Sequence, residues 1–357
     1  FDGKDFLKQG PKGCNLCAGV IAESLNKKLK NEGIFLPEKR IINRVEGYCL
    51  HVSNQDLLLS RQEQGGNSIA TVFRGNGPRS SAFPRIVSFD DYLLSWAKDN
   101  GTKVIPKPVW KVELYEDKLK PVNLYYGKMD NPQKYEADLI VGAFGVNTVL
   151  MEKIKNLSFG YKPPSTLITY QAELKLGSER IFQNFGNNIH IYMPRSKTIR
   201  FATVIPKGDY ITVTLIGKKN AGKDIFSEFL NLKDIQNKIP LLEPHCACYP
   251  KITISPSRKP FTHRLVIIGD ASFSRHYKNG IESAFITAKL AAETALFYGI
   301  DSQSFSTYYY KQAKKHIIYD NYYGRALFFI NDIISSMPLL TQSHLFFAKR
   351  KDKKDPS

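Results

Sequence analysis

Two pairs of closely spaced cysteines are the residues whose types and spacing bear most directly on chemistry. Cys14 and Cys17 lie in a glycine-rich segment, and Cys246 and Cys248 lie far along the chain. A structural zinc ion takes four ligands, so the two pairs together could close one zinc site. A Cys-x-x-Cys spacing also lowers a thiol pKa and favours dithiol redox chemistry. Packing of small apolar side chains is the third interpretation, and the residues alone leave all three open.

A second candidate site lies where an apolar run gives way to a helix. Leu265 to Ile268 is typical of a strand buried on both faces, and Gly269-Asp270-Ala271 follows at once. From Gly280 and Ile281 onward, Ala, Thr, Lys and Glu with small apolar residues predict a helix. The N–H groups at the start of that helix can face an anionic or electron-rich ligand, because they have no partner within the helix.

Hydrophobic spacing predicts the helices that position these residues. One helix is expected over residues 20–31, and others begin at Ser88, at Ile281 and near Ile300. Ser88 is the expected N-cap of its helix, with Asp91 three residues later. Four alanines would let the Ile281 helix lie close against a sheet: Ala284, Ala288, Ala291 and Ala292.

Alternating residues predict strands in three regions. Residues 45–52 and 68–74 are expected to pair, and 104–115 with 119–126 form a hairpin-like pair. Within residues 137–147, an apolar strand begins at Ala137 and runs into the segment Gly-Ala-Phe-Gly-Val-Asn, which starts at Gly142. An antiparallel sheet is expected from residues 166–174, 188–193, 198–206 and 209–216.

The composition favours a packed globular protein with anionic partners. Among 357 residues, 42% are hydrophobic, and 51 Lys and Arg against 33 Asp and Glu give a net charge of +18. No zinc-finger or RNA-binding pattern points to nucleic acid, and no signal peptide or spanning apolar run is found. Five cysteines are too few for a disulfide framework, so a cytoplasmic location is expected, with Cys49 as a buried small side chain.

The two apolar strands and the glycines that follow them resemble those of a known family. A strand, Gly-Asp-Ala, a loop and Gly-Ile before an Ala-rich helix resemble the flavin motif of FAD-dependent oxidoreductases built like p-hydroxybenzoate hydroxylase. Gly142 to Asn147 is similar to the end of another strand in that superfamily. The chain looks most like the geranylgeranyl reductase family, and the resemblance runs from Asp2 to about Gly324.

The resemblance implies an α/β fold with a Rossmann-like FAD/NAD(P)-binding domain, an inserted antiparallel-sheet substrate domain and a C-terminal helical segment. The expected boundaries are 1–155 and 259–300 for the FAD domain, 156–258 for the substrate domain and 301–357 for the helical region. The family's cysteine-containing glycine loop lies close to flavin and substrate. Cys14 and Cys17 are the expected catalytic residues, and Cys14, which lies deeper in that loop, is expected to border the reactive face of the flavin.

The resemblance also implies which residues hold the cofactor and the substrate. The expected FAD contacts are Asp2, Arg85, Val109, Gly142, Gly145, Gly269, Asp270, Ala271, Gly280 and Ile281, with Arg74 and Arg79 as alternatives to Arg85. The expected substrate contacts are Phe201, Ile205 and Pro206. Asp2 would bind the adenosine ribose, and Asp270 the ribityl or pyrophosphate region.

The chain departs from the family pattern in three places. It has no G-x-G-x-x-G turn, and because it begins at Phe1 we expect that an N-terminal unit is missing. Phe144 replaces the family's common aspartate, and no tryptophan accompanies Pro206 in the segment that lines the isoprenoid channel. The pattern therefore specifies the cofactor more closely than the substrate.

The implied activity is hydride transfer from reduced FAD to a carbon–carbon double bond of an isoprenoid or other lipid, with NAD(P)H or another reductant as electron donor. One alternative is an aromatic hydroxylase-type flavin monooxygenase. The other is a flavin-free membrane-binding module, suggested by the missing glycine turn and the net charge of +18. The apolar residues 326–347 beside the basic residues 349–354 suit a membrane interface, and a core-packed terminal helix with a solvated lysine tail is the alternative. Peripheral contact with an anionic membrane is expected for the lipid reductase and for the membrane-binding module.

Overall fold

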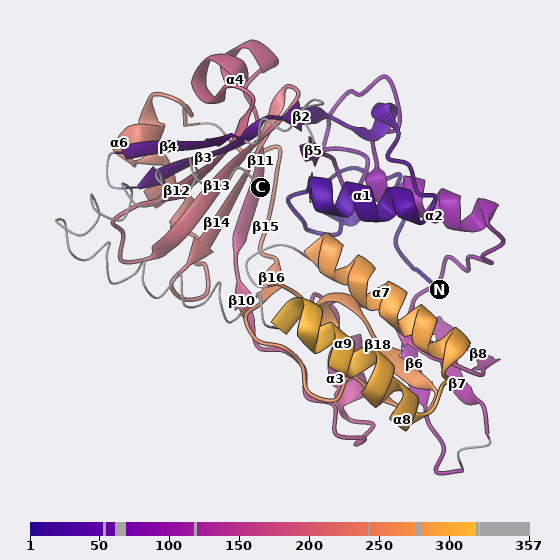
Figure 1. The fold of residues 1–357 in the computed structure, drawn as a ribbon. Helices are drawn as coiled ribbons and strands as arrows, with labels where there is room; N and C mark the ends of the chain where they lie inside the picture. Colours follow the sequence, from indigo (N-terminus) through magenta and orange to yellow (C-terminus); the bar gives the residue numbers. More distant parts are fainter. Residues whose placement is uncertain are drawn as a thin grey trace. The chain divides into compact units, whose positions relative to one another are not determined.

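The computed structural model describes residues 1–52, 55–60, 69–117, 120–241, 243–275, 280–318 and 321. The chain divides into two compact units (Figure 1). Unit 1 comprises Phe1–Lys4, Lys103–Leu167 and Lys251–Leu327, and unit 2 comprises Asp5–Thr102, Ile168–Pro250 and Phe328–Ser357. The expected domain boundaries at 155, 258 and 300 stay predictions, because compactness alone does not reveal which residues bind a cofactor.

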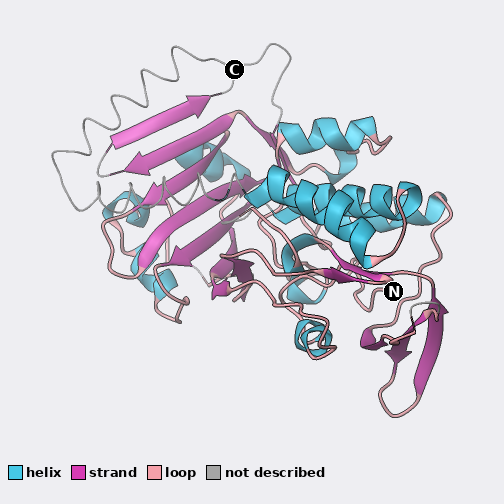
Figure 2. Ribbon diagram, turned by 60° about the horizontal axis from the view of Figure 1, so that its bottom comes forward, coloured by secondary structure: helices cyan, strands magenta, loops and turns pink. Residues whose placement is uncertain are grey.

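A seven-stranded sheet dominates unit 2, and its strands lie side by side in Figure 2. Its order is β15-β11-β14-β13-β12-β3-β4, and every neighbouring pair is antiparallel except β12 with β3. The predicted antiparallel sheet is thereby confirmed. The strands are β3 (Gly47–Val52), β4 (Gln55–Ser60), β11 (Tyr170–Lys175), β12 (Asn188–Met193), β13 (Ile199–Lys207), β14 (Tyr210–Gly217) and β15 (Cys246–Cys248).

The main core of unit 2 packs on this sheet. Every residue of the central strand β14 is buried, which is typical of a strand covered on both faces. Three short helices contribute apolar side chains such as Phe185, Phe229 and Ile235 to the same core. They are α4 (Ser178–Phe185), α5 (Ile225–Leu230) and α6 (Lys233–Gln236).

The first segment of unit 2 forms a second, three-stranded sheet in the order β1-β5-β2. It consists of β1 (Val20–Ile21), β5 (Ile69–Thr71) and β2 (Asn43–Val45), and helix α1 (Glu23–Asn31) follows β1. The predicted start of this helix at Val20 is wrong, because the backbones of Val20 and Ile21 pair with β5. The expected pairing of residues 45–52 with 68–74 holds only at Val45, where β2 pairs with β5. Residues 47–52 of that range form β3, which pairs with β4 and β12 instead.

Helix α2 (Phe89–Asp99) begins as its capping residues predict. The Ser88 hydroxyl accepts a hydrogen bond from the Asp91 N–H at 3.1 Å, and Ser88 itself is fully buried. Since this bond satisfies one N–H that the first turn leaves unpaired, Ser88 fixes where the helix starts.

In unit 1, β18 (Leu265–Ile267) pairs in parallel with β9 (Ile140–Gly142) and antiparallel with β17 (Phe261–Thr262). All three residues of β18 are buried, as the sequence predicts. Helix α7 (Gly280–Phe297) follows the short turn η3 (Gly269–Ala271). Of the four alanines expected to face the sheet, Ala291 is buried and Ala292 is exposed, so the face is narrower than predicted.

The rest of unit 1 is a three-stranded meander and a helical C-terminal stretch. The meander consists of β6 (Val109–Glu113), β7 (Val122–Gly127) and β8 (Pro132–Ala137), which adds a third strand to the predicted hairpin. The remaining elements are α3 (Leu150–Lys155), β10 (Thr166–Ile168), β16 (Lys251–Thr253), α8 (Ser302–Ser304), η4 (Phe305–Tyr310), α9 (Lys311–Ala313) and η5 (Lys314–Ile318). The segments 326–347 and 349–354 lie outside the described residues. Among the helices that are described, none is long and apolar enough to cross a bilayer.

Candidate functional site

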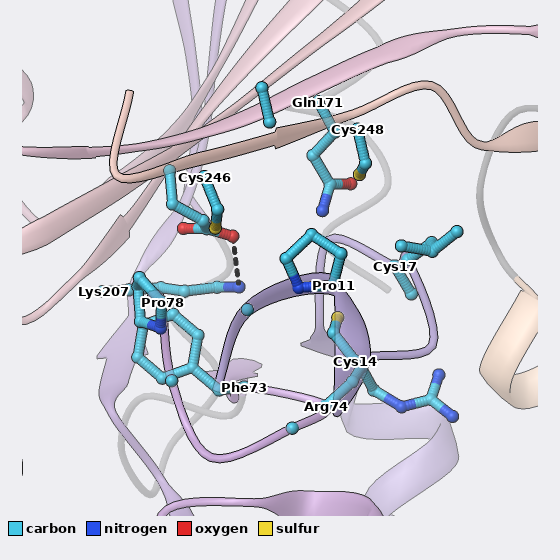
Figure 3. Close-up of a pocket in the computed structure, with 16 residues that line it drawn as sticks. Pro11, Cys14, Cys17, Phe73, Arg74, Pro78, Gln171, Lys207, Cys246 and Cys248 are labelled. Atoms are coloured by element: carbon cyan, nitrogen blue, oxygen red, sulfur yellow. Dashed lines mark ion pairs between the residues drawn. The ribbon is translucent and has the colours of Figure 1, made fainter. Parts of the chain in front are cut away.

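A pocket in unit 2 gathers both cysteine pairs (Figure 3). Cys14 and Cys17 come from the glycine-rich loop, and Cys246 and Cys248 come from β15 on the opposite wall. The other lining residues are Gly10, Pro11, Leu16, Phe73, Arg74, Gly75, Gly77, Pro78, Gln171, Glu173, Lys207 and Ala247. The walls are mostly apolar, with a few polar groups converging on them, as is typical of a ligand site.

Two glycines let the backbone segments that form one wall approach each other. A Cβ on Gly13 would lie 1.9 Å from the Lys8 carbonyl oxygen, and one on Gly75 would lie 2.6 Å from the Gly13 carbonyl. The loop is closed by hydrogen bonds from the Gly10 N–H to Gly77 O (2.9 Å) and from the Cys14 N–H to Gly10 O (3.1 Å). Cys14 is therefore held by backbone contacts on both sides of the loop.

The four cysteines share this pocket, but their placement does not favour the zinc site, which was one of the alternatives. Among the described residues, no three of these sulfurs lie within 4.8 Å of one another. Burial raises the pKa of the Cys14 thiol, and it raises the pKa of Cys246 to about 11. Because reactive dithiols depend on lowered pKa values, these shifts also disfavour the redox interpretation.

A buried ion pair forms another part of the pocket. The Lys207 ammonium lies 3.9 Å from a Glu173 carboxylate oxygen, with the two side chains 1% and 10% exposed. Glu173 also accepts hydrogen bonds from the Thr212 hydroxyl at 2.9 and 2.8 Å. Lys207 lies over the Phe73 ring, 4.7 Å from its centroid. A buried ion pair thus borders a pocket whose walls are mostly apolar.

Of the candidate arginines, Arg74 lines the pocket, whereas Arg85 and Arg79 are exposed. The Arg74 guanidinium donates to the Asp90 carboxylate at 2.5 Å, and Asn15 donates to the same carboxylate at 2.6 Å. Asp90 lies in the first turn of α2, so the helix that Ser88 caps also positions Arg74.

The expected substrate residues lie on the strand that carries Lys207, but they do not line this pocket. Phe201, Ile205 and Pro206 are buried, and Ile205 packs in a cluster with Val45 and Ile69. Lys207, the next residue along β13, reaches the pocket instead. The assignment of Phe201, Ile205 and Pro206 as substrate contacts stays a prediction.

In unit 1, the structure places Asp270 at the start of α7. A Cβ on Gly280 would lie 3.0 Å from Asp270 Oδ1, so a larger residue would crowd the carboxylate where it meets the helix. Gly269 adopts φ +65°, and its N–H donates to the Thr287 hydroxyl at 2.8 Å. Ile281 is half-buried on α7, and the buried Ala271 accepts a hydrogen bond from Tyr161 through its carbonyl (2.6 Å). A half-buried carboxylate beside the start of a long helix fits the hydroxyl groups of a ribityl chain.

The other expected cofactor residues are distributed over the same unit. Gly142 ends β9, and Gly145 has φ +63°, with no atom within 4 Å of the place that a Cβ would take. Val109 begins β6, and Asp2 is exposed with its N–H donating to Ile105 O at 3.2 Å. Asn147, part of the glycine motif, instead bonds both backbone groups of Lys251 through its side chain. Asn147 thus has a structural partner within unit 1.

The sequence reasoning missed two groups of polar residues. Glu173 and Lys207 escaped notice because a single charge in a strand usually faces solvent. His51 and His190 escaped because they lie 139 positions apart in sequence, although His51 Nε2 lies 2.8 Å from His190 Nδ1. Cys49, expected as a buried small side chain, is half-exposed beside them. Burial lowers the pKa of both imidazoles, that of His190 to about 4.

Comparison with known proteins identifies the fold. No protein-family model matches the sequence, and no relative was found among curated proteins. A geranylgeranyl bacteriochlorophyll reductase-like protein from Thermoplasma acidophilum is similar with a TM-score of 0.63 at 15% identity, over 87% of this chain and 76% of that one. A triple mutant of the flavin-dependent brominase Bmp2 is similar with a TM-score of 0.67 at 15% identity, over 97% of this chain and 92% of that one.

A third solved structure, p-nitrophenol 4-monooxygenase PnpA from Pseudomonas putida DLL-E4, gives 0.60 at 9% identity, over 84% of this chain and 76% of that one. At such identities the likeness shows the fold alone. The expected fold class is confirmed: this is an α/β chain with the Rossmann-like fold of FAD-dependent flavoproteins.

Proposed function

We propose that this chain is an FAD-dependent oxidoreductase that reduces a carbon–carbon double bond of an isoprenoid or similar lipid. One observation carries the proposal: strand β18 is followed by the turn Gly269-Asp270-Ala271 and then by helix α7. In this arrangement the Asp270 carboxylate lies beside Gly280, where the helix starts. It occurs on a fold shared with flavin-dependent proteins. When bound, FAD would supply the hydride.

The proposed cofactor contacts in unit 1 follow from the chemistry of their groups. Asp270 would accept hydrogen bonds from ribityl or phosphate-proximal hydroxyls, and the backbone at Gly280 and Ile281 would face the electron-rich ring. The further contacts proposed in this unit are Asp2, Val109, Gly142, Gly145, Gly269 and Ala271.

In unit 2, we assign the pocket around Cys14 to the reacting end of the substrate. Phe73, Pro11 and Pro78 provide apolar walls that exclude water, which suits an alkene. Because burial raises the pKa of Cys14, its thiol stays protonated at neutral pH. Cys14 can then donate the proton that the second alkene carbon needs and recover it from solvent. Cys14→Ser should lower turnover and leave the bound flavin unchanged.

The cofactor assignment is tested on the full natural chain that contains these residues. Asp270→Asn keeps the shape of the side chain but removes its charge, and Asp270→Ala removes both. We expect both variants to lose most of their flavin during gel filtration, measured as the ratio of flavin to protein absorbance. Asp130→Ala, at an exposed turn of the same unit, is the matched control and should keep it. Full flavin retention by Asp270→Ala would contradict the assignment.

The aromatic monooxygenase remains the second candidate, because a p-nitrophenol monooxygenase shares this fold. Oxygen dependence separates the two activities. A reductase turns over an isoprenoid alkene anaerobically with NAD(P)H or dithionite as reductant, whereas a monooxygenase consumes oxygen and hydroxylates its substrate. If the full chain never retains flavin, the flavin-free membrane-binding alternative is favoured instead.

A further inference from the structure

Three potential metal ligands lie together in the seven-stranded sheet of unit 2, away from the two cysteine pairs. Cys49 and His51 lie on β3, and His190 lies on β12, which runs parallel to β3. His190 is directly opposite Cys49, and Tyr192 is opposite His51. Because alternate residues of a strand share a face, all of these side chains point to the same side of the sheet.

The two histidines are joined by their rings and each has a second, fixed partner. His51 Nε2 lies 2.8 Å from His190 Nδ1. His51 Nδ1 lies 2.6 Å from a carboxylate oxygen of Asp56, the residue opposite it on β4. His190 Nε2 lies 2.7 Å from the Phe185 carbonyl oxygen.

These outer partners determine which nitrogens carry hydrogen. A carboxylate and a carbonyl can only accept, so His51 must carry its proton on Nδ1 and His190 on Nε2. The facing nitrogens, His51 Nε2 and His190 Nδ1, are then both bare. Two lone pairs at 2.8 Å repel each other unless a cation lies between them, and that cation is either an extra proton or a metal ion.

We propose that Cys49, His51 and His190 bind a zinc-type divalent ion. The Cys49 sulfur and one ring nitrogen of each histidine all lie within 4.8 Å of one another, and no other such group occurs in the described part of the chain. Two imidazoles and a thiolate suit the borderline-soft Zn²⁺. A bridging proton would leave the cysteine without a role, whereas the metal uses all three groups.

The geometry needs only a small adjustment. Tetrahedral Zn²⁺ with Zn–N bonds of about 2.1 Å holds two nitrogens ~3.4 Å apart, so the facing nitrogens, now 2.8 Å apart, must separate by roughly 0.6 Å. Both rings are nearly buried, and the Tyr192 ring stacks on His51 with centroids 4.1 Å apart, which limits their rotation. Cys49 is half-exposed, so a fourth position is open to water or a small ligand.

Asp56 and the Phe185 carbonyl are the outer partners that metal-bound histidines usually have. Such groups orient the imidazole and raise its basicity, and their loss weakens metal affinity by about 10- to 100-fold. Asp56 is exposed and lies outside the core, so Asp56→Asn tests this effect without a large cavity.

The test is zinc binding by the full chain, with metal content and X-ray absorption at the zinc edge as readouts. We expect one equivalent of Zn²⁺ after dialysis against a weak chelator, with one sulfur and two or three nitrogen or oxygen neighbours. Cys49→Ser and His190→Gln should abolish stoichiometric binding, and Asp56→Asn should raise the Kd by about 10- to 100-fold. Circular dichroism confirms that each variant is folded.

A variant with Cys14, Cys17, Cys246 and Cys248 all changed to Ser is the matched control and should keep the zinc. If that variant loses the metal, or the edge spectrum shows four sulfurs, the site lies at the cysteine pairs and the proposal is wrong. If the folded wild-type chain binds no zinc, the histidines share a proton and the proposal is also wrong.

Discussion

At the residue scale, the thiols of Cys14 and Cys246 differ from reactive cysteines because they are partly buried in a mostly apolar pocket. Desolvation disfavours the thiolate, which raises the pKa of both thiols and that of Cys246 to about 11. Since alkylating reagents attack the thiolate, iodoacetamide should label Cys246 at pH 8 at least tenfold more slowly in the folded chain than in urea. Labelling should accelerate about tenfold per pH unit toward pH 11. Peptide mass spectrometry gives the rates, and equal rates in folded and unfolded chain would disprove the shift.

Single residues were predictable where a local pattern determines them. Ser88 caps its helix and Asp270 meets Gly280 because a few neighbouring residues decide both features. Lys207 and His190 were not predictable, because their partners come from strands distant in sequence. The three substrate residues were inferred from a resemblance that cannot determine which residue of a strand reaches a pocket.

At the element scale, the Lys207–Glu173 pair connects strands β13 and β11 on either side of β14. Both side chains are buried, so removing the Lys207 charge leaves the Glu173 carboxylate in the core without this counter-ion. We expect Lys207→Met to lower the free energy of unfolding of unit 2 by about 3–5 kcal/mol, and the Lys207→Met/Glu173→Leu double variant to recover a large part. Urea unfolding should be followed in a Trp110→Phe background, where the remaining tryptophan, Trp96, reports on unit 2. Additive losses in the double variant would refute this coupling.

Most elements were predictable, whereas their pairings were not. The alternation of apolar and polar residues predicted the bounds of β12, β13 and β14 to within one residue, because the two-residue period is clear in all three strands. The parallel pairing of β12 with β3 joins residues about 140 positions apart, and no local signal encodes it. Helix α1 starts late because Val20 and Ile21 form backbone pairs with a strand some 50 residues further along, and a helical pattern in sequence does not reveal that competition.

At the scale of the whole molecule, the largest unexplained property is the net charge of +18. The proposed lipid substrate would have to be taken from a bilayer, and a positively charged protein is attracted to anionic headgroups. Five of the positive charges lie in residues 349–354, outside the described structure. Each basic residue near an anionic surface contributes roughly 1 kcal/mol, and salt screens the attraction over about 8 Å at physiological ionic strength.

We therefore expect the full chain to co-sediment with phosphatidylserine-containing vesicles at low salt and to be released as salt rises. Changing the five basic residues of 349–354 to Gln keeps the chain length and should weaken binding at least severalfold, because their attraction is lost. Changing five exposed lysines elsewhere, Lys98, Lys103, Lys128, Lys134 and Lys289, is the matched control for net charge. If both variants lose binding equally, the overall charge and not this cluster is responsible. Equal binding to neutral vesicles would show that apolar contacts dominate, and no binding to any vesicle would favour a water-soluble substrate.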